Sequence, residues 1–256
     1  MEDRIRFLDT QEGRRLAYCL TSGASPGVVF LPGFKSDMEG TKALALETHL
    51  KAEGRALLRF DYSGHGRSSG AFEDGTIGAW KADTVAVIDA LTQGPQILVG
   101  SSMGGWLALL ATLARPDRVK GLVLIAPAPD FTEKLMWANF GEAAKKKILR
   151  EGWVAMPSDY DDEPYKITRA LIEDGRDHQL LDGPIAFDGP VRLLHGQEDP
   201  DVPWEWSMKI AERLTSHDVI ISLNKSGDHR LSEPDDITRL CRAVDEVASK
   251  LGGEGA

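Results

Sequence analysis

Two adjacent serines stand where an apolar run meets a glycine pair, in the stretch QILVGSSMGGWLALLA (96–111). The pattern G-x-S-x-G is formed by Gly100, Ser102 and Gly104, after a predicted strand and before a predicted helix, which is typical of a nucleophile elbow. A turn this tight requires small residues two positions before and after the serine. Ser101 has a valine and a methionine at those positions, so the spacing selects Ser102 as the candidate nucleophile.

A serine hydroxyl needs a histidine to take its proton and a carboxylate to orient the imidazole. In a sheet with this elbow, the acid and then the histidine follow the serine along the chain, each after a later strand. His229, in KSGDHRLS, follows the last predicted strand and is the candidate base. The loop HGQEDPDVPW offers Glu198, Asp199 and Asp201, and Asp199 is the expected acid because the proline after it would make the turn rigid. Asp228 is a less favoured alternative that is expected to cap the histidine loop.

Backbone N–H groups must also stabilise the oxyanion that develops during acyl transfer. Met103, the residue after the serine, is expected to supply one N–H group. The other is expected from Phe34 in LPGFKSD, where Gly33 permits a close approach of the backbone.

A second glycine-rich stretch, RFDYSGHGRSSG (59–70), resembles a phosphate-binding loop. Its last glycine spacing is one residue too long, and no clean helix follows at once. His65 within it is interpreted as a loop hydrogen-bonding residue. Cys19 and Cys241 lie far apart without a CxxC spacing, which argues against a zinc site and a disulfide. We therefore expect no cofactor and no metal.

The chain between these residues alternates short apolar runs with amphipathic stretches, which predicts an α/β fold with a mostly parallel sheet and helices on both faces. The apolar runs are 27–33, 56–64, 96–102, 121–129, 191–199 and 219–229, and the helical segments include 40–54, 77–92, 206–215 and 235–251. The first two segments, RIRFLDT and RRLAYCLT, lack an intervening helix and predict an antiparallel hairpin at the sheet edge. Residues 1–256 are expected to form a single domain.

This alternation of apolar runs and amphipathic stretches is interrupted once, at residues 131–187, which predicts a helical lid over the ligand crevice. The segment carries apolar side chains at Phe131, Met136, Trp137, Phe140, Trp153, Met156, Tyr160 and Tyr165. Five of them are candidate substrate-binding residues: Met136, Trp137, Phe140, Trp153 and Met156. The alternative is that these side chains only pack the lid onto the domain.

The charge balance bears on partners. Thirty basic and 40 acidic residues give a net charge of −10, which repels phosphate backbones and argues against nucleic acid as a partner. No window approaches the roughly 18 apolar residues of a membrane span. The first residues, MEDRIRFLDTQEGRRL, do not match a targeting segment, so the expected compartment is the cytoplasm. The sequence predicts no oligomeric state.

These stretches together resemble the α/β-hydrolase superfamily, and within it the branch of mitochondrial palmitoyl-protein thioesterases and mycophenolic acid acyl-glucuronide esterases with their bacterial relatives. The resemblance rests on PGF with GTKALALE, RFDYSG, GPQILVGSSMGGW, RLLHGQEDPDVPW and SGDHR, and runs from about residue 28 to the last helix. It implies that the nucleophile, acid and base are Ser102, Asp199 and His229.

The resemblance also implies cleavage of acyl thioesters, including S-palmitoyl cysteine, and of acyl esters through an acyl-serine intermediate. The substrate would be a small acyl ester or thioester, or an S-acylated protein. One alternative is a general carboxylesterase acting on small esters or acyl glucuronides. An alternative of another class is a non-catalytic ligand-binding member of the fold, which fluorophosphonate labelling would distinguish because only an activated serine reacts.

Overall fold

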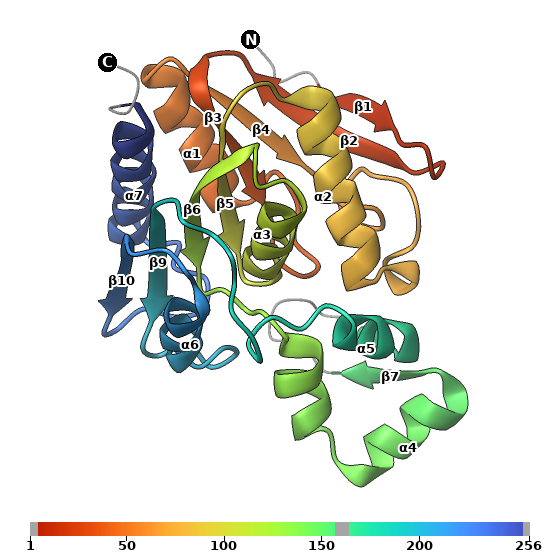
Figure 1. The fold of residues 1–256 in the computed structure, drawn as a ribbon. Helices are drawn as coiled ribbons and strands as arrows, with labels where there is room; N and C mark the ends of the chain where they lie inside the picture. Colours follow the sequence, from red (N-terminus) through yellow and green to blue (C-terminus); the bar gives the residue numbers. More distant parts are fainter. Residues whose placement is uncertain (1–4, 157–163, 253–256) are drawn as a thin grey trace.

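The computed structural model describes residues 5–156 and 164–252, which form an eight-stranded sheet flanked by helices (Figure 1). In spatial order the strands are β1 (Arg6–Asp9), β2 (Arg15–Thr21), β4 (Arg55–Phe60), β3 (Ala24–Leu31), β5 (Gln96–Ser101), β6 (Val119–Ile125), β9 (Val191–Gly196) and β10 (Val219–Asn224). At one edge β1 pairs antiparallel with β2, and β2 pairs antiparallel with β4. Strands β4, β3, β5, β6, β9 and β10 are parallel to one another. The predicted α/β fold and the edge hairpin are confirmed.

Helices cover both faces of this sheet because successive side chains of a strand point to opposite faces. Ile97 and Val99 of β5 pack with α1 (Thr41–Ala52) and α7 (Pro234–Gly252). Leu98 between them packs on the other face. That face is covered by α2 (Ile77–Leu91), α3 (Met103–Ala114) and α6 (Glu205–Arg213). Both faces being buried explains why the strands read as continuous apolar runs.

The segment between β6 and β9 leaves the sheet, and we call residues 131–187 the insertion. It contains a π-helical turn (Thr132–Trp137), α4 (Glu142–Glu151), the antiparallel pair β7 (Trp153–Met156) and β8 (Tyr165–Thr168), and α5 (Arg169–Arg176). Figure 1 draws α4, α5 and β7 below α2 and α3, away from β9 and β10. The sequence predicted helices here but not the strand pair. Tyr160 lies outside the described residues.

Hydrogen bonds tie the insertion to the sheet-bearing part of the chain. The buried carboxylate of Asp130 accepts from the N–H groups of Leu180 and Leu181 at 2.7 and 3.0 Å, which joins the two ends of the insertion. The indole of Trp106 in α3 donates to the carbonyl of His178 at 3.1 Å. These bonds hold the insertion against α3, the helix that follows the candidate nucleophile. Within the two described ranges, no helix is long and apolar enough to cross a bilayer.

Candidate active site

Ser102 lies at the turn between β5 and α3, in a backbone conformation that few non-glycine residues adopt (φ 55°, ψ −118°). Its N–H group donates to the carbonyl of Ile125 at 2.8 Å, and its carbonyl accepts from Gly105 and Ala128 at 2.9 and 3.1 Å. Hydrogen bonds to the neighbouring strand and to the following helix therefore hold the serine in this strained geometry.

The turn has no room for side chains at the flanking glycines. A Cβ atom on Gly100 would lie 2.3 Å from the carbonyl oxygen of Gly104. One on Gly104 would lie 2.1 Å from the carbonyl oxygen of Leu31 in β3. The steric requirement that selected Ser102 from the sequence is thus present in the structure.

The loops after β9 and β10 bring the two other candidate residues to the serine. His229 Nε2 lies 3.1 Å from Ser102 Oγ, and His229 Nδ1 lies 2.7 Å from Asp199 Oδ2. The side chain of His229 is 15% exposed and that of Asp199 only 1%. A carboxylate can only accept here, so Nδ1 carries the proton and Nε2 is left to accept from the serine hydroxyl. The structure therefore places the candidate nucleophile, base and acid in one chain of hydrogen bonds.

Asp199 is held as an anion by its donors. Its Oδ1 accepts from the N–H groups of Asp201 and Val202, both at 2.9 Å. Burial alone would raise the pKa of Asp199, but hydrogen bonds from His195 and His229 outweigh it and hold the pKa well below its usual value. The carboxylate is therefore charged at neutral pH.

The other two acids near the histidine have different positions. Asp201 lies close by: a carboxylate oxygen of Asp199, a carboxylate oxygen of Asp201 and a ring nitrogen of His229 all lie within 4.8 Å of one another. Asp228 accepts from the N–H group of Leu231 at 2.9 Å and caps the histidine loop, as the sequence predicted.

The loop after β3 lies against the serine. A Cβ atom on Gly33 would lie 3.4 Å from the carbonyl oxygen of Ser101 and 3.5 Å from Ser102 Cβ, so the backbone of Gly33 and Phe34 passes beside the nucleophile. Met103 is the first residue of α3, a position whose N–H group has no partner within the helix. Both expected oxyanion donors therefore belong to backbone segments that adjoin Ser102.

His65 supports the loop after β3 from behind. Its Nε2 accepts from the N–H group of Lys35 at 3.2 Å, and its Nδ1 faces the carbonyl of Ser63 at 3.2 Å. Lys35 has a positive φ of 57°, so this bond holds a strained residue next to Phe34. Burial lowers the pKa of His65 to about 4, which keeps the ring neutral. The interpretation of His65 as a loop hydrogen-bonding residue agrees with these contacts.

A cavity of about 640 Å³ opens beside Ser102 and His229. One part of its lining is apolar and comes from the insertion: Phe131, Leu135, Met136, Phe140, Met156, Tyr165 and Ile167. Polar lining residues come from the loop after β3, the start of α1 and the histidine loop: Lys35, Ser36, Asp37, Thr41, Lys42, Arg230 and Ser232. Met136, Phe140 and Met156, three of the five candidate substrate-binding residues, line this cavity.

Trp137 and Trp153 do not line it, which corrects the sequence-based expectation. The ring of Trp137 lies between Lys145 and Arg176, at 5.7 and 5.2 Å from its centroid. Trp153 is 37% exposed and packs against the ammonium groups of Lys147 and Lys166. Side chains alternate along a strand, so Trp153 of β7 points away from the face that carries Met156.

Sequence reasoning did not single out Leu135, Ile167 and Lys42 as lining residues. Ile167 lies two residues after Tyr165 and therefore on the same face of β8, but that signal depends on recognising the strand.

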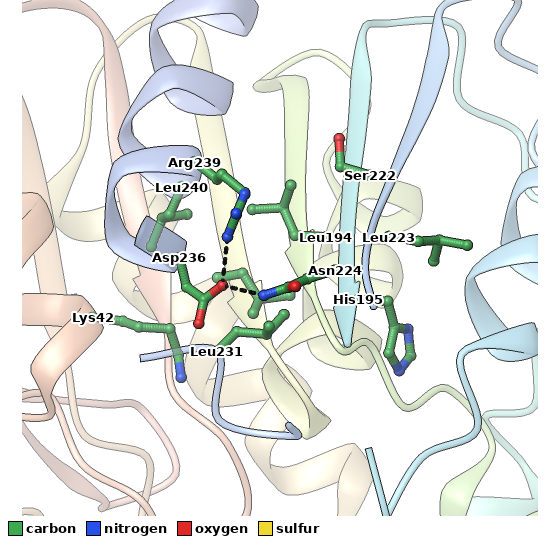
Figure 2. A pocket seen from close by; sticks show the side chains of 11 residues that line it. Lys42, Leu194, His195, Ser222, Leu223, Asn224, Leu231, Asp236, Arg239 and Leu240 are labelled. Atoms are coloured by element: carbon green, nitrogen blue, oxygen red, sulfur yellow. Dashed lines mark hydrogen bonds and ion pairs between the residues drawn. The ribbon is translucent and has the colours of Figure 1, made fainter. Parts of the chain in front are cut away.

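A second cavity of about 320 Å³ lies behind the histidine loop, between β9, β10 and α7 (Figure 2). Asp236 Oδ1 accepts there from Asn224 and Arg239 at 2.9 and 2.8 Å. Lys42 lines both cavities, and its ammonium donates to the carbonyl of Arg230. Burial lowers the pKa of Lys42 to about 8. Leu231 of the histidine loop lines this second cavity, whereas Ser102 and His229 line the first.

Known proteins resemble the chain over nearly its full length. The profile described as "Alpha/beta hydrolase family" matches residues 28–240. The mitochondrial palmitoyl-protein thioesterase ABHD10 of Homo sapiens is 44% identical over 248 residues, covering 96% of this chain and 81% of the relative. The protein of the same name from Bos taurus is 45% identical over 251 residues, with the same coverage.

Two solved structures have the same architecture. A putative hydrolase from Agrobacterium vitis S4 superimposes with a TM-score of 0.92 at 40% identity, covering 96% of this chain and 98% of that one. Alpha/beta hydrolase domain-containing protein 10 from mouse gives a TM-score of 0.90 at 42% identity, covering 97% and 99%.

Proposed function

The chain belongs to the α/β-hydrolase family, and from that premise we propose that it is a serine hydrolase that cleaves acyl thioesters and acyl esters through an acyl-serine intermediate. One observation carries the proposal: His229 Nε2 lies 3.1 Å from Ser102 Oγ while His229 Nδ1 lies 2.7 Å from Asp199 Oδ2. This geometry suits a hydroxyl that is to lose its proton to an imidazole held in one tautomer by a carboxylate.

The reaction then runs in two halves. His229 takes the proton of Ser102 as Oγ attacks the acyl carbonyl, and the N–H groups of Phe34 and Met103 stabilise the oxyanion. Asp199 orients the imidazole and stabilises its cationic form. His229 returns the proton to the leaving thiolate or alkoxide, and the acyl group stays on Ser102. A water molecule, deprotonated by His229, then releases the acid by the same route.

The acyl chain is proposed to lie against the insertion and the leaving group against the polar lining residues of the cavity. The apolar lining from the insertion, with Met136, Phe140 and Met156, matches a flexible hydrocarbon chain. The insertion acts in this proposal as a lid within a single domain. The relatives named palmitoyl-protein thioesterase support S-acyl cysteine as a substrate class, in a small molecule or in an S-acylated protein.

The cytoplasm remains our prediction for the compartment of this chain. The printed names of these relatives include the word mitochondrial, and fractionation of cells that express the natural gene tests the prediction.

A substrate panel tests the proposal. We would measure kcat/KM for a palmitoyl-cysteine peptide, a palmitoyl and an acetyl p-nitrophenyl ester, and an acyl glucuronide, each with and without fluorophosphonate pretreatment. The proposal expects hydrolysis of the palmitoyl peptide that fluorophosphonate abolishes. Turnover of acetyl esters and acyl glucuronides without turnover of palmitoyl substrates would instead identify a general carboxylesterase. Absence of both labelling and turnover would identify a ligand-binding member of the fold.

A further inference from the structure

His195 is a buried histidine that the proposed reaction does not use. It lies at the end of β9, and its side chain is 0% exposed. Figure 2 shows its ring apart from the cluster formed by Asp236, Asn224 and Arg239 in the second cavity. A buried imidazole needs partners for both of its nitrogens.

The ring of His195 has such partners on both sides. Nε2 lies 3.2 Å from Asp199 Oδ2 and 3.0 Å from the carbonyl oxygen of Val202. Nδ1 lies 2.7 Å from Ser207 Oγ in α6. The carboxylate and the carbonyl can only accept, so Nε2 carries a proton, and the hydroxyl of Ser207 can donate to Nδ1. The contacts therefore fix one tautomer, whose Nε2–H group is shared between the carbonyl oxygen of Val202 at 3.0 Å and the candidate acid at 3.2 Å.

This places two histidines on one oxygen atom, because Oδ2 of Asp199 also accepts from His229 Nδ1 at 2.7 Å. The other oxygen, Oδ1, accepts from the N–H groups of Asp201 and Val202. Donors thus surround the carboxylate on both oxygens. Without His195, Oδ2 would keep the hydrogen bond from His229 Nδ1 but lose the second contact that helps to fix its direction.

We propose that His195 is a positioning residue for the reaction proposed above. Its Nε2–H group helps to fix the orientation of the Asp199 carboxylate, and the same N–H dipole partly compensates the negative charge that His229 faces. The inference rests on the proposed function, since it assigns His195 a role only through Asp199.

The sign of the resulting pH effect follows from the charges around His229. The carboxylates of Asp199 and Asp201 face it, Asp228 and Arg230 flank it along the loop, and His195 lies behind Asp199. Removing the N–H donor leaves the negative charge of Asp199 less compensated, which favours the imidazolium form of His229. Since the base must be neutral to act, activity is then lost at a higher pH on acidification.

The test compares His195→Leu, which removes the donor, with His195→Gln, whose amide nitrogen can donate at the position of Nε2. His195→Leu is expected to lower kcat by about 10- to 100-fold, the cost of a lost hydrogen bond to a charged group, with KM within about twofold. The acid limb of kcat/KM is expected to move up by about half a pH unit. His195→Gln should keep most of the activity and the wild-type limb. His178→Leu, at a histidine that does not touch Asp199, is the matched control and should change neither.

A folded His195→Leu protein with wild-type kcat and pH profile would overturn the inference. A His195→Leu protein with a lower Tm but an unchanged acid limb would also overturn the inference. A His195→Gln protein as impaired as His195→Leu would do the same, because either result is what a purely structural residue would give. If His195→Leu fails to fold, Ser207→Ala replaces it, with a loss of several-fold in kcat and an upward limb shift expected, and an unchanged limb overturning the inference. Ser102→Ala is assayed alongside, and full turnover by that variant would contradict the proposed function itself. If Ser102→Ala is inactive, a negative result with the His195 variants contradicts only the inference about His195.

Discussion

The elbow region, made of β5, α3 and the loops after β3, β9 and β10, differs from the insertion in what determines its geometry. In the elbow region the backbone determines it: Ser102 is held by hydrogen bonds of its own N–H and carbonyl groups, and Gly104 packs directly against the backbone of β3. In the insertion the side chains determine it, through rings packed on cations at Trp137 and Trp153 and through the apolar lining of the cavity.

The difference teaches how the molecule divides its tasks. Bond making and breaking need reacting atoms held to within fractions of an ångström, and a backbone turn with no spare space supplies that. Selection of an acyl chain needs shape and apolar surface, which can change with single side chains. Substitutions in the two regions should therefore differ in kind, with kcat affected in one and substrate preference in the other.

The largest difference is expected for a methyl group added to a glycine in each region. Gly104→Ala puts Cβ 2.1 Å from the carbonyl oxygen of Leu31, so the elbow must shift, and kcat is expected to fall at least about 100-fold. Gly141→Ala, in the insertion, meets nothing within 4 Å and is the matched control. Equal kcat values for the two variants would show that the elbow tolerates displacement, and would contradict the difference proposed here between the elbow region and the insertion.

A smaller effect is expected on acidification, through His65 behind the loop after β3. Its pKa is about 4 in the folded protein against 6.5 for the free side chain, so between these values the unfolded chain binds more protons. Stability is therefore lost as the pH falls through this window, by about 2 kcal/mol between pH 7 and pH 5.

Urea unfolding at both pH values measures this loss. His65→Gln retains an acceptor for the Lys35 N–H group but does not titrate, so it should lose less stability than the wild type. His217→Gln, at an exposed histidine, should behave as the wild type. An identical acid loss in all three proteins would refute the role of His65.

The smallest effect is expected for a side chain of the insertion that faces the cavity. Met156→Ala removes apolar contact with a long acyl chain, which should raise KM for a palmitoyl ester about tenfold and leave an acetyl ester unchanged. Trp153→Ala, on the opposite face of the same strand, is the control and should leave both KM values unchanged. A larger effect of Trp153→Ala than of Met156→Ala would reverse our assignment of the two faces of β7.

The same division decides what the sequence predicted. The elbow was predictable because its requirement is local and steric, so the glycines beside Ser102 carry it by themselves. Asp199 and His229 followed from the order of strands in a parallel sheet. The strand pair of the insertion was not predicted, because β7 and β8 are four residues each and too short for a clear pattern of period two. Trp153 was misassigned for that reason, because the face of β7 on which it lies depends on a strand that only the folded chain reveals. Trp137 lies instead in the π-helical turn, and its packing against Lys145 and Arg176 depends on tertiary contacts.

His195 illustrates a further limit. Its position at the tip of an apolar run was visible in the sequence, but its partners come from the turn at Val202 and from Ser207 in α6. Only tertiary structure brings these groups around Asp199.

The most direct test of the account is fluorophosphonate labelling and turnover of Ser102→Ala beside Ser101→Ala, with Tm measured for both. We predict that Ser101→Ala labels and hydrolyses a palmitoyl thioester nearly as the wild type does, whereas Ser102→Ala keeps its Tm, does not label and has no turnover above background. Labelling or wild-type turnover by a folded Ser102→Ala protein would contradict the claim that Ser102 is the nucleophile.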